Sequence, residues 1–144
     1  MKTKTKLTIG TITAATLIAL AALAQSAGQY SVKGSRPVVI KTVPTAGATD
    51  VDPNLKEITV TFSKDMIDHN WSICQSTPPE NFPEDSATGE KMHYMPDKRT
   101  CVMPVKLQPG RTYVLWFNRG NYMGFKDVSG KSSWPYELVF ETKQ

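Results

Sequence analysis

The chain has 144 residues, and its 17 lysines and arginines against 13 aspartates and glutamates give a formal net charge of +4 at pH 7. Once an N-terminal targeting segment is set aside, the remaining residues suffice for one domain with a single core, which excludes a second domain of ordinary size. The basic residues are scattered among acidic ones, whereas a nucleic-acid-binding face concentrates them. Composition therefore excludes nucleic acid as a partner.

The first 24 residues have the three parts of a secretory signal peptide. A positively charged start is formed by Lys2, Lys4 and Lys6. The stretch from Leu7 to Leu23 carries no charge, and Ala22-Leu23-Ala24 supplies the small residues that a signal peptidase requires. We therefore predict that residues 1–24 are a signal peptide cleaved after Ala24, and that the protein is exported, to the periplasm or to the outside of the cell.

An uncleaved membrane anchor is the alternative for this segment. It is disfavoured because the apolar run contains four threonines and a glycine and is shorter than the roughly 20 residues of a spanning helix. No cysteine follows the run, which argues against a lipoprotein. Cleavage would remove three lysines and no acidic residue, so that the exported part keeps 14 basic and 13 acidic residues and is nearly neutral. No transmembrane segment is expected after cleavage.

The composition changes again at Pro37. Residues 25–36 are small and polar and have no periodicity, which is typical of a flexible leader. From Pro37 onward, short alternating segments follow one another to the end of the chain. We therefore place the folded domain at residues 37–144.

Alternating apolar and polar residues predict the strands of this domain. The strictest alternation is Glu57–Ser63, where Ile58, Val60 and Phe62 share one face. Residues 136–141 alternate in the same way. Further strands are predicted over residues 38–43, 100–107 and 113–117, with one face of the second of these formed by Cys101, Met103, Val105 and Leu107.

Proline, glycine, asparagine and aspartate separate these strands, as turns require. They recur at residues 44–47, 52–54, 108–110 and 129–130. No segment after the signal keeps a helical period over three turns. Short strands with regular turn signals and no helices predict an all-β fold, an antiparallel sandwich or barrel.

The corner between two predicted strands narrows the fold class. Residues 107–113 read Leu-Gln-Pro-Gly-Arg-Thr-Tyr, and a tyrosine in this position can return its hydroxyl to the backbone of the corner. This tyrosine corner is typical of immunoglobulin-like sandwiches. We therefore predict a single immunoglobulin-like (Ig-like) antiparallel β-sandwich with Tyr113 at its corner.

Four segments in this order resemble the bacterial Ig-like domain known from S-layer proteins. They are Pro44–Pro53, Ile58–Met66, Pro109–Tyr113 and Asp127–Gly130. The resemblance extends over roughly residues 37–142 and implies the same sandwich. Because such domains serve as modules of varied exported proteins, it also implies a non-enzymatic role in binding or structural spacing at the cell envelope, with a protein or a glycan as partner.

Aromatic residues provide the candidate binding site. Trp71 and Trp116 lie within strand patterns and are expected in the core. The segment from Asn118 to Trp134 is expected to form a loop at one end of the sandwich, where function is often located. Its aromatic side chains could form an apolar platform for a sugar ring or a partner's side chain, and we predict Tyr122, Phe125 and Trp134 as the binding residues.

A copper site is the alternative function. Thioether and imidazole ligands suit copper, and Met92, His93 and Met95 lie almost side by side in the sequence. Periplasmic copper carriers of the copper-resistance C type are also Ig-like sandwiches, but this chain has Gln25 where their N-terminal histidine would stand. Methionines that fill the core are the favoured interpretation, and we predict no cofactor.

Cys74 and Cys101 are the two cysteines, and export to an oxidising compartment makes them candidates for a disulfide. The strand patterns place Cys101 on an inward face, whereas Cys74 points outward if Trp71 and Ile73 point inward. This arrangement disfavours the bridge, because a disulfide needs Cβ atoms within about 4.5 Å.

Catalysis has no support in the sequence. The two histidines, His69 and His93, accompany no recognisable nucleophile motif. The paired aspartates near turns, such as Asp50 and Asp52, commonly bond their own backbone and do not form a calcium loop. We therefore predict that the protein is not an enzyme.

Overall fold

A computed structural model describes residues 31–84 and 91–144. The predicted signal peptide, residues 1–24, and the first part of the predicted leader lie outside the described residues. Arg36–Gln144 forms one compact unit. Immediately before it, Ser31–Ser35 is a turn in which the Ser35 N–H donates to the Ser31 carbonyl over 2.9 Å. Within the described ranges, no helix has the length and apolarity needed to cross a membrane.

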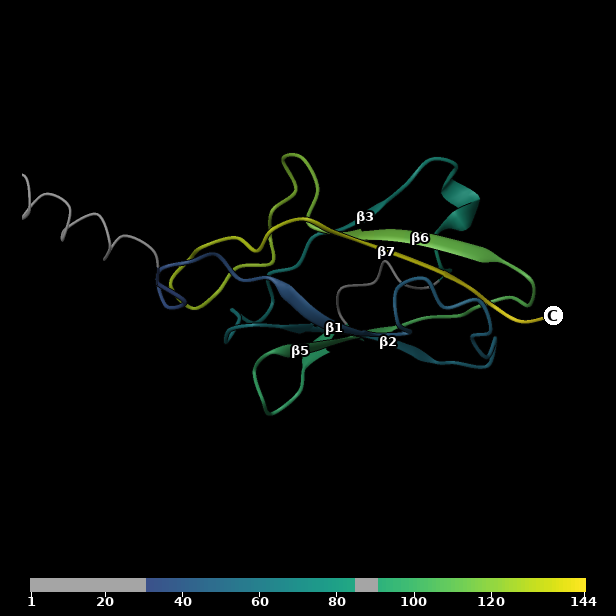
Figure 1. Ribbon diagram of the computed structural model, residues 1–144, viewed down its shortest axis with the longest axis horizontal. Helices are drawn as coiled ribbons and strands as arrows, with labels where there is room; N and C mark the ends of the chain where they lie inside the picture. The colour runs from purple at the N-terminus through teal and green to yellow at the C-terminus, as the bar shows by residue number, and fades with distance from the viewer. Residues whose placement is uncertain (1–30, 85–90) are drawn as a thin grey trace, which may run out of the picture. The chain divides into compact units, whose positions relative to one another are not determined.

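Seven strands in the described part of the chain form two antiparallel sheets. The first sheet has the order β1 (Val39–Val43), β2 (Glu57–Phe62), β5 (Thr100–Pro104) and β4 (His93–Tyr94). The second has the order β3 (Ile73–Gln75), β6 (Thr112–Phe117) and β7 (Tyr136–Glu141). Figure 1 shows the sheets as two layers. This order of strands is that of a constant-type immunoglobulin sandwich, which confirms the predicted fold class.

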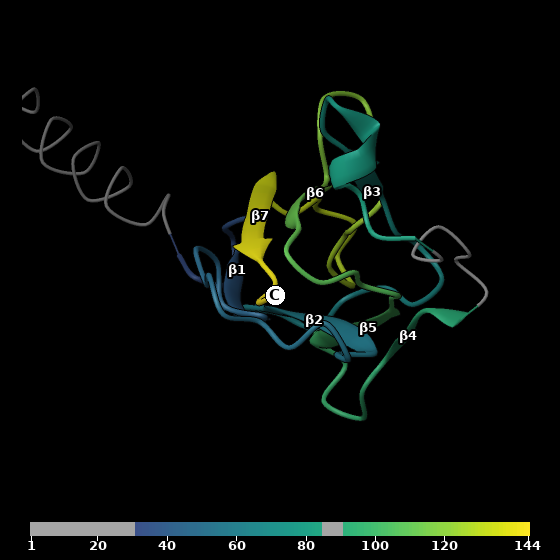
Figure 2. The ribbon, with the colours of Figure 1, turned by 90° about the vertical axis from the view of Figure 1, so that its right-hand side faces the viewer.

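The segment after β1 passes from one sheet to the other. β1 pairs with β2 in the first sheet. After the turn that follows, the Gly47 N–H donates to the Val139 carbonyl and the Glu141 N–H to the Ala48 carbonyl, both over 2.7 Å. Figure 2 shows β1 and β7 on the same side of the sandwich, which these bonds close.

The alternating faces predicted from the sequence meet between the two layers. Ile58, Val60 and Phe62 of β2 are buried, and so are the inward residues of the facing strands, Tyr113, Leu115, Phe117, Leu138 and Phe140. β5 differs from the prediction in two ways. It ends at Pro104, after which the Val105 N–H donates to the Lys56 carbonyl. Its outward residue Val102 is also buried.

The tyrosine corner is present. The Gln108 N–H donates to the Tyr113 hydroxyl over 2.8 Å, and the Thr142 hydroxyl donates to the Gln108 carbonyl over 2.6 Å. Gly110 occupies the left-handed region at φ +62°, and an added Cβ would lie 2.7 Å from the Gln144 side chain. The positive φ therefore favours glycine at this corner, and Tyr113 fixes the connection between the two sheets.

Tyr113→Phe is expected to lower the free energy of unfolding by about 1 kcal/mol, because the half-buried Gln108 N–H loses its acceptor. Urea denaturation measures the change. Tyr122→Phe is the matched control, since Tyr122 is exposed and surface changes usually stay within about 0.5 kcal/mol. Equal stability of Tyr113→Phe and the wild type would show that the corner bond does not stabilise the fold.

A short helix lies in the long connection between β3 and β4. η1 (Pro79–Asn81) is a single 3-10 turn, closed by the Phe82 N–H donating to the Pro79 carbonyl over 3.0 Å. Phe82 then packs against the core. The backbone of Glu84 pairs antiparallel with the backbone of Lys106. This segment, residues 76–84, therefore runs from the second sheet to the end of β5.

Candidate binding site

The loop between β6 and β7, residues 118–135, begins with a small hairpin. Arg119 and Tyr122 exchange two backbone hydrogen bonds of 2.9 Å each. Gly120, the first residue of the two-residue turn between them, has φ +56°, as a type II′ hairpin turn favours. We call residues 119–122 the hairpin.

A buried asparagine holds both ends of this loop. The side chain of Asn118 is 0% exposed, and its Nδ2 donates to the carbonyls of Phe125 and Ser133 over 3.1 and 3.2 Å and to the Ser133 Oγ over 2.9 Å. Its Oδ1 accepts the Phe125 N–H over 3.0 Å. Asn118 has φ +63°, a conformation that asparagine tolerates better than most residues. This one amide therefore links the start of the loop to Phe125 and Ser133.

A charged turn holds the second half of the loop. The Asp127 Oδ1 accepts bonds from the Ser129 N–H, the Ser129 hydroxyl and the Lys131 N–H, over 3.0, 2.6 and 2.9 Å. The ammonium of Lys64 lies 3.5 Å from its Oδ2. Burial raises the pKa of Asp127, but the hydrogen bonds and the charge of Lys64 outweigh burial, so that the pKa lies below its ordinary value. A charged Asp127 thus stabilises the turn.

The hairpin and the edge strand β3 form an open pocket of about 330 Å³, which we call the hairpin pocket. The Arg119 Nη1 donates to the Gln75 carbonyl over 3.0 Å, and its guanidinium lies 5.2 Å from the ring centre of Trp116. Tyr122 is 71% exposed at the rim. The lining consists of Cys74, Gln75, Arg119, Gly120, Asn121 and Tyr122. The pocket is therefore built on a fixed arginine beside an exposed aromatic ring.

Of the three predicted binding residues, the structure brings only Tyr122 to this pocket. The prediction of Phe125 as an exposed anchor is wrong, because its side chain is 0% exposed and its ring lies 5.2 Å from that of Phe62 and 5.8 Å from that of Phe117. After the hairpin, the bonds to Asn118 turn the chain back into the core.

Trp134 is exposed but does not line the hairpin pocket. Trp134 is 56% exposed, and its backbone N–H donates to the Pro37 carbonyl. The guanidinium of Arg36 lies 4.3 Å from the centre of its ring. Arg36 also donates from Nε to the Ser132 carbonyl over 2.7 Å. Arg36, which composition placed in the leader, is thus part of the compact unit. The three-residue aromatic platform expected from the sequence is not formed.

The two tryptophans expected in the core are only half-buried. Trp71 packs against the core and lies 5.7 Å from the ring of Tyr94. Trp116 is half-buried opposite Cys74 and Glu137, and its Nε1 is buried with no acceptor among the described residues. Trp116 is therefore not one of the buried core residues. Its ring instead contacts the guanidinium of Arg119 of the hairpin.

The candidate copper ligands lie at and beside β4 but do not share one exposed surface. Met92 is buried in the core, whereas His93 of β4 is exposed and Met95 is 40% exposed. The His93 Nδ1 lies 3.3 Å from the Lys91 carbonyl oxygen. In the ranges that the structure describes, no three histidine, cysteine, aspartate or glutamate side chains gather where they could hold a metal ion. Burial of Met92 keeps its thioether away from the surface that carries His93 and Met95.

The two cysteines are free and belong to different sheets. Cys101 is buried in the first sheet, and burial, with the nearby charge of Asp68, raises its pKa to about 12. Cys74 lines the hairpin pocket, and burial raises its pKa even though Arg119 opposes the shift. The disulfide considered from the sequence is not formed, and both thiols are protonated and weakly reactive at neutral pH.

Sequence reasoning missed Asn118, Arg119 and Gln75. A usable signal was present, because a Gly-Asn pair between two apolar segments predicts a two-residue hairpin. That pattern could have located the hairpin and its tip. It could not have shown that Arg119 reaches the backbone of Gln75, which lies 44 positions away.

The chain is similar to one protein family and to solved structures of S-layer proteins. The protein-family model that matches residues 33–142 is described as a bacterial Ig-like domain. Three solved structures are similar: S-layer protein rSbsC(31-844), with 22% identity and a TM-score of 0.46; surface layer protein SbsC, domains 1-6, with 22% and 0.47; and the N-terminal part of the bacterial S-layer protein SbsC, with 21% and 0.45.

The matches cover 92%, 92% and 91% of this chain but only 17%, 17% and 29% of those proteins. The chain therefore spans less than a third of the length of each. No match was found among curated proteins.

Proposed function

Because the chain belongs to the bacterial Ig-like domain family, we propose that it is an exported, non-enzymatic recognition module of the cell envelope that binds a protein through the hairpin pocket. Export rests on the signal sequence of residues 1–24, with its lysines, uncharged run and small residues before the cleavage site. The hairpin lies in the connection between the sixth and seventh strands, which carries a recognition loop in immunoglobulin variable domains.

The exposed ring of Tyr122 is the observation that carries this proposal. A tyrosine that is 71% exposed on a hairpin with two cross-strand bonds presents a large contact area that loses little freedom on binding. Residues 118–122 read Asn-Arg-Gly-Asn-Tyr, the residue types that dominate antibody binding loops. Tyrosine and arginine are also enriched among the side chains that contribute most to protein interfaces.

The charges of the hairpin pocket favour one kind of partner surface. The side chains that line it are neutral except for the guanidinium of Arg119, which is already positioned by Gln75 and Trp116. A partner that inserts an acidic or uncharged side chain beside Tyr122 would meet no carboxylate among the described lining residues. The proposed partner is therefore a protein with a neutral or acidic patch.

The same residues argue against catalysis. The nucleophile that lines the hairpin pocket is Cys74, and its pKa is raised. No imidazole or carboxylate is among the described residues that line the pocket to activate this thiol. The arrangement can hold a partner but provides no base for covalent chemistry.

Tyr122→Ala is expected to weaken binding of the full chain to washed envelopes of the cells that produce it by about tenfold or more. An aromatic side chain in an interface contributes about 2 kcal/mol, and the variant removes that contribution. Tyr122→Phe should keep most of the affinity. The measurement is the fraction of chain bound as its concentration is raised.

Val128→Ala is the matched control, because Val128 is 70% exposed in the same loop but does not line the hairpin pocket. Its affinity should equal that of the wild type. Equal affinities for Tyr122→Ala and Val128→Ala would refute the assignment of the hairpin as the recognition element.

A further inference from the structure

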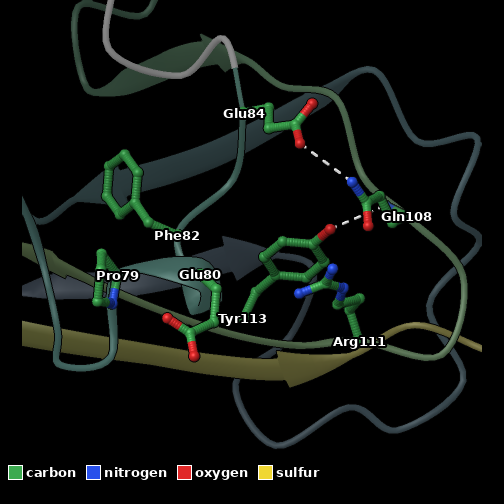
Figure 3. A pocket seen from close by; sticks show the side chains of 7 residues that line it. All are labelled: Pro79, Glu80, Phe82, Glu84, Gln108, Arg111 and Tyr113. Carbon is green, nitrogen blue, oxygen red and sulfur yellow. Dashed lines mark hydrogen bonds between the residues drawn. The ribbon is translucent and has the colours of Figure 1, made fainter.

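A second pocket, of about 190 Å³, lies where the segment after η1 meets the tyrosine corner. We call it the corner pocket, and Figure 3 shows its lining side chains. They come from two segments that are distant in the sequence: the segment of η1, and the end of the β5–β6 connection with the start of β6. The lining consists of Pro79, Glu80, Phe82, Glu84, Gln108, Arg111 and Tyr113.

Tyr113 lines this pocket together with Pro79 and Phe82, but it is only 3% exposed. Tyr113 is held by the Gln108 N–H and by its stacked neighbour Phe140, whose ring centre lies 5.4 Å away. Phe82 is fixed by its packing against the core. The apolar part of the corner pocket is thus formed before any ligand arrives.

Polar groups of both signs surround this apolar part. The Gln108 Nε2 donates to the Glu84 Oε1 over 3.0 Å, which orients both side chains. Among the described residues, the carboxylate of Glu80 and the guanidinium of Arg111 have no ion-pair or hydrogen-bond partner. Figure 3 shows these two groups on different sides of the Tyr113 ring. The pocket therefore offers free acceptors and free donors around the exposed Pro79 and the half-buried Phe82.

This combination disfavours ligands that carry charge of one sign only. An anion would be attracted by Arg111 but repelled by Glu80 and Glu84, and a cation would meet the opposite conflict. An uncharged polyol avoids both conflicts, because each hydroxyl can donate to a carboxylate and accept from a guanidinium. The carbon face of a pyranose ring would lie on the apolar side chains of Pro79 and Phe82.

We propose that the corner pocket binds a single uncharged sugar ring of an envelope glycan. Its volume is below the roughly 300–1,000 Å³ of pockets that enclose drug-sized ligands, so that it would hold one ring and leave the rest of the glycan outside. This site is independent of the proposed protein partner.

The two pockets lie at opposite ends of β6. Arg111 of the corner pocket directly precedes this strand, and the hairpin follows it. Six residues of strand span about 20 Å, so a ligand in one pocket does not occupy the other. A chain with both sites occupied would link a protein to a glycan.

The test is a titration of the ¹⁵N-labelled full chain with methyl α-D-glucopyranoside, methyl β-D-galactopyranoside, methyl α-D-mannopyranoside and N-acetylglucosamine, up to tens of millimolar. At least one sugar should give saturable shifts at the backbone amides of Gln108, Arg111 and Tyr113. Sodium acetate and methylammonium chloride should not. Saturable shifts from either salt, shifts confined to other residues, or no saturation with any sugar would overturn the proposal.

Variants separate a specific site from weak surface contact. Arg111→Ala and Glu80→Ala should each weaken the binding of the responding sugar by about tenfold or more, and Glu80→Gln should recover part of it because an amide oxygen still accepts. Glu137→Ala, an exposed carboxylate of β7 outside the pocket, is the control. Unchanged affinity in both alanine variants would refute the site. Tyr122→Ala should leave sugar binding intact, which distinguishes failure here from failure of the hairpin proposal.

Discussion

Asn118→Ala is expected to lower the free energy of unfolding by about 4 kcal/mol, as measured by urea denaturation. The change leaves the Phe125 N–H, the Ser133 carbonyl and the Ser133 hydroxyl without their Asn118 partner, in a place where Asn118 is 0% exposed. The Phe125 carbonyl keeps the Ser133 N–H. Buried polar groups left without partners cost about 1–3 kcal/mol each. Alanine at φ +63° adds roughly 1 kcal/mol of backbone strain.

Two further variants separate these contributions. Asn118→Gly removes the same hydrogen bonds but adopts a positive φ without strain, so it should be about 1 kcal/mol more stable than Asn118→Ala. Asn121→Ala, in the exposed turn of the same hairpin, should change stability by less than about 0.5 kcal/mol. A loss below about 1 kcal/mol for Asn118→Ala would mean that the loop does not depend on this amide.

Phe125→Ala is expected to be about as destabilising, with a loss of about 4 kcal/mol. The ring is fully buried between Phe62 and Phe117, and removal of a buried phenylalanine side chain costs about 3–5 kcal/mol through lost burial and a cavity. The same denaturation experiment measures this change. Phe125→Leu, which fills part of the cavity, should retain most of the stability.

A comparison with Tyr122 tests whether Phe125 serves stability and Tyr122 serves binding. Tyr122→Ala should leave the free energy of unfolding within about 0.5 kcal/mol of the wild type, because the ring is exposed, while it weakens partner binding. If Phe125→Ala were stable and defective only in binding, the original sequence-based assignment of Phe125 to the binding surface would be right and the packing described above would be wrong.

The sandwich could be predicted because its strands alternate strictly. Ile58, Val60 and Phe62 repeat at the two-residue period of a strand, and a face with this period is buried wherever a second layer covers it. The residues around the corner carried similar information, since Pro109 and Gly110 are turn residues and Tyr113 follows at the spacing that its hydroxyl bond requires. Both signals are local in the sequence.

The binding surface could not be predicted in the same way, because its contacts are not local. Phe125 and Tyr122 are aromatic residues of one loop, and no pattern in their neighbours distinguishes a buried ring from an exposed one. The difference arises from Asn118 and Ser133, which lie on either side of Phe125 in the chain and draw its backbone inward. The hairpin pocket likewise depends on contacts between β3 and residues more than 40 positions away.

The most direct test of the account is site-specific photo-cross-linking from the tip of the hairpin. A photoreactive phenylalanine analogue is placed at residue 122 of the full chain, and in separate variants at Val128 and at His93, which are both exposed but outside the hairpin pocket. After illumination of the cells that produce the chain, residue 122 should form one discrete protein adduct that Arg119→Ala diminishes, and the other two positions should not form it. The same adducts from all three positions, or none from residue 122, would contradict recognition through the hairpin.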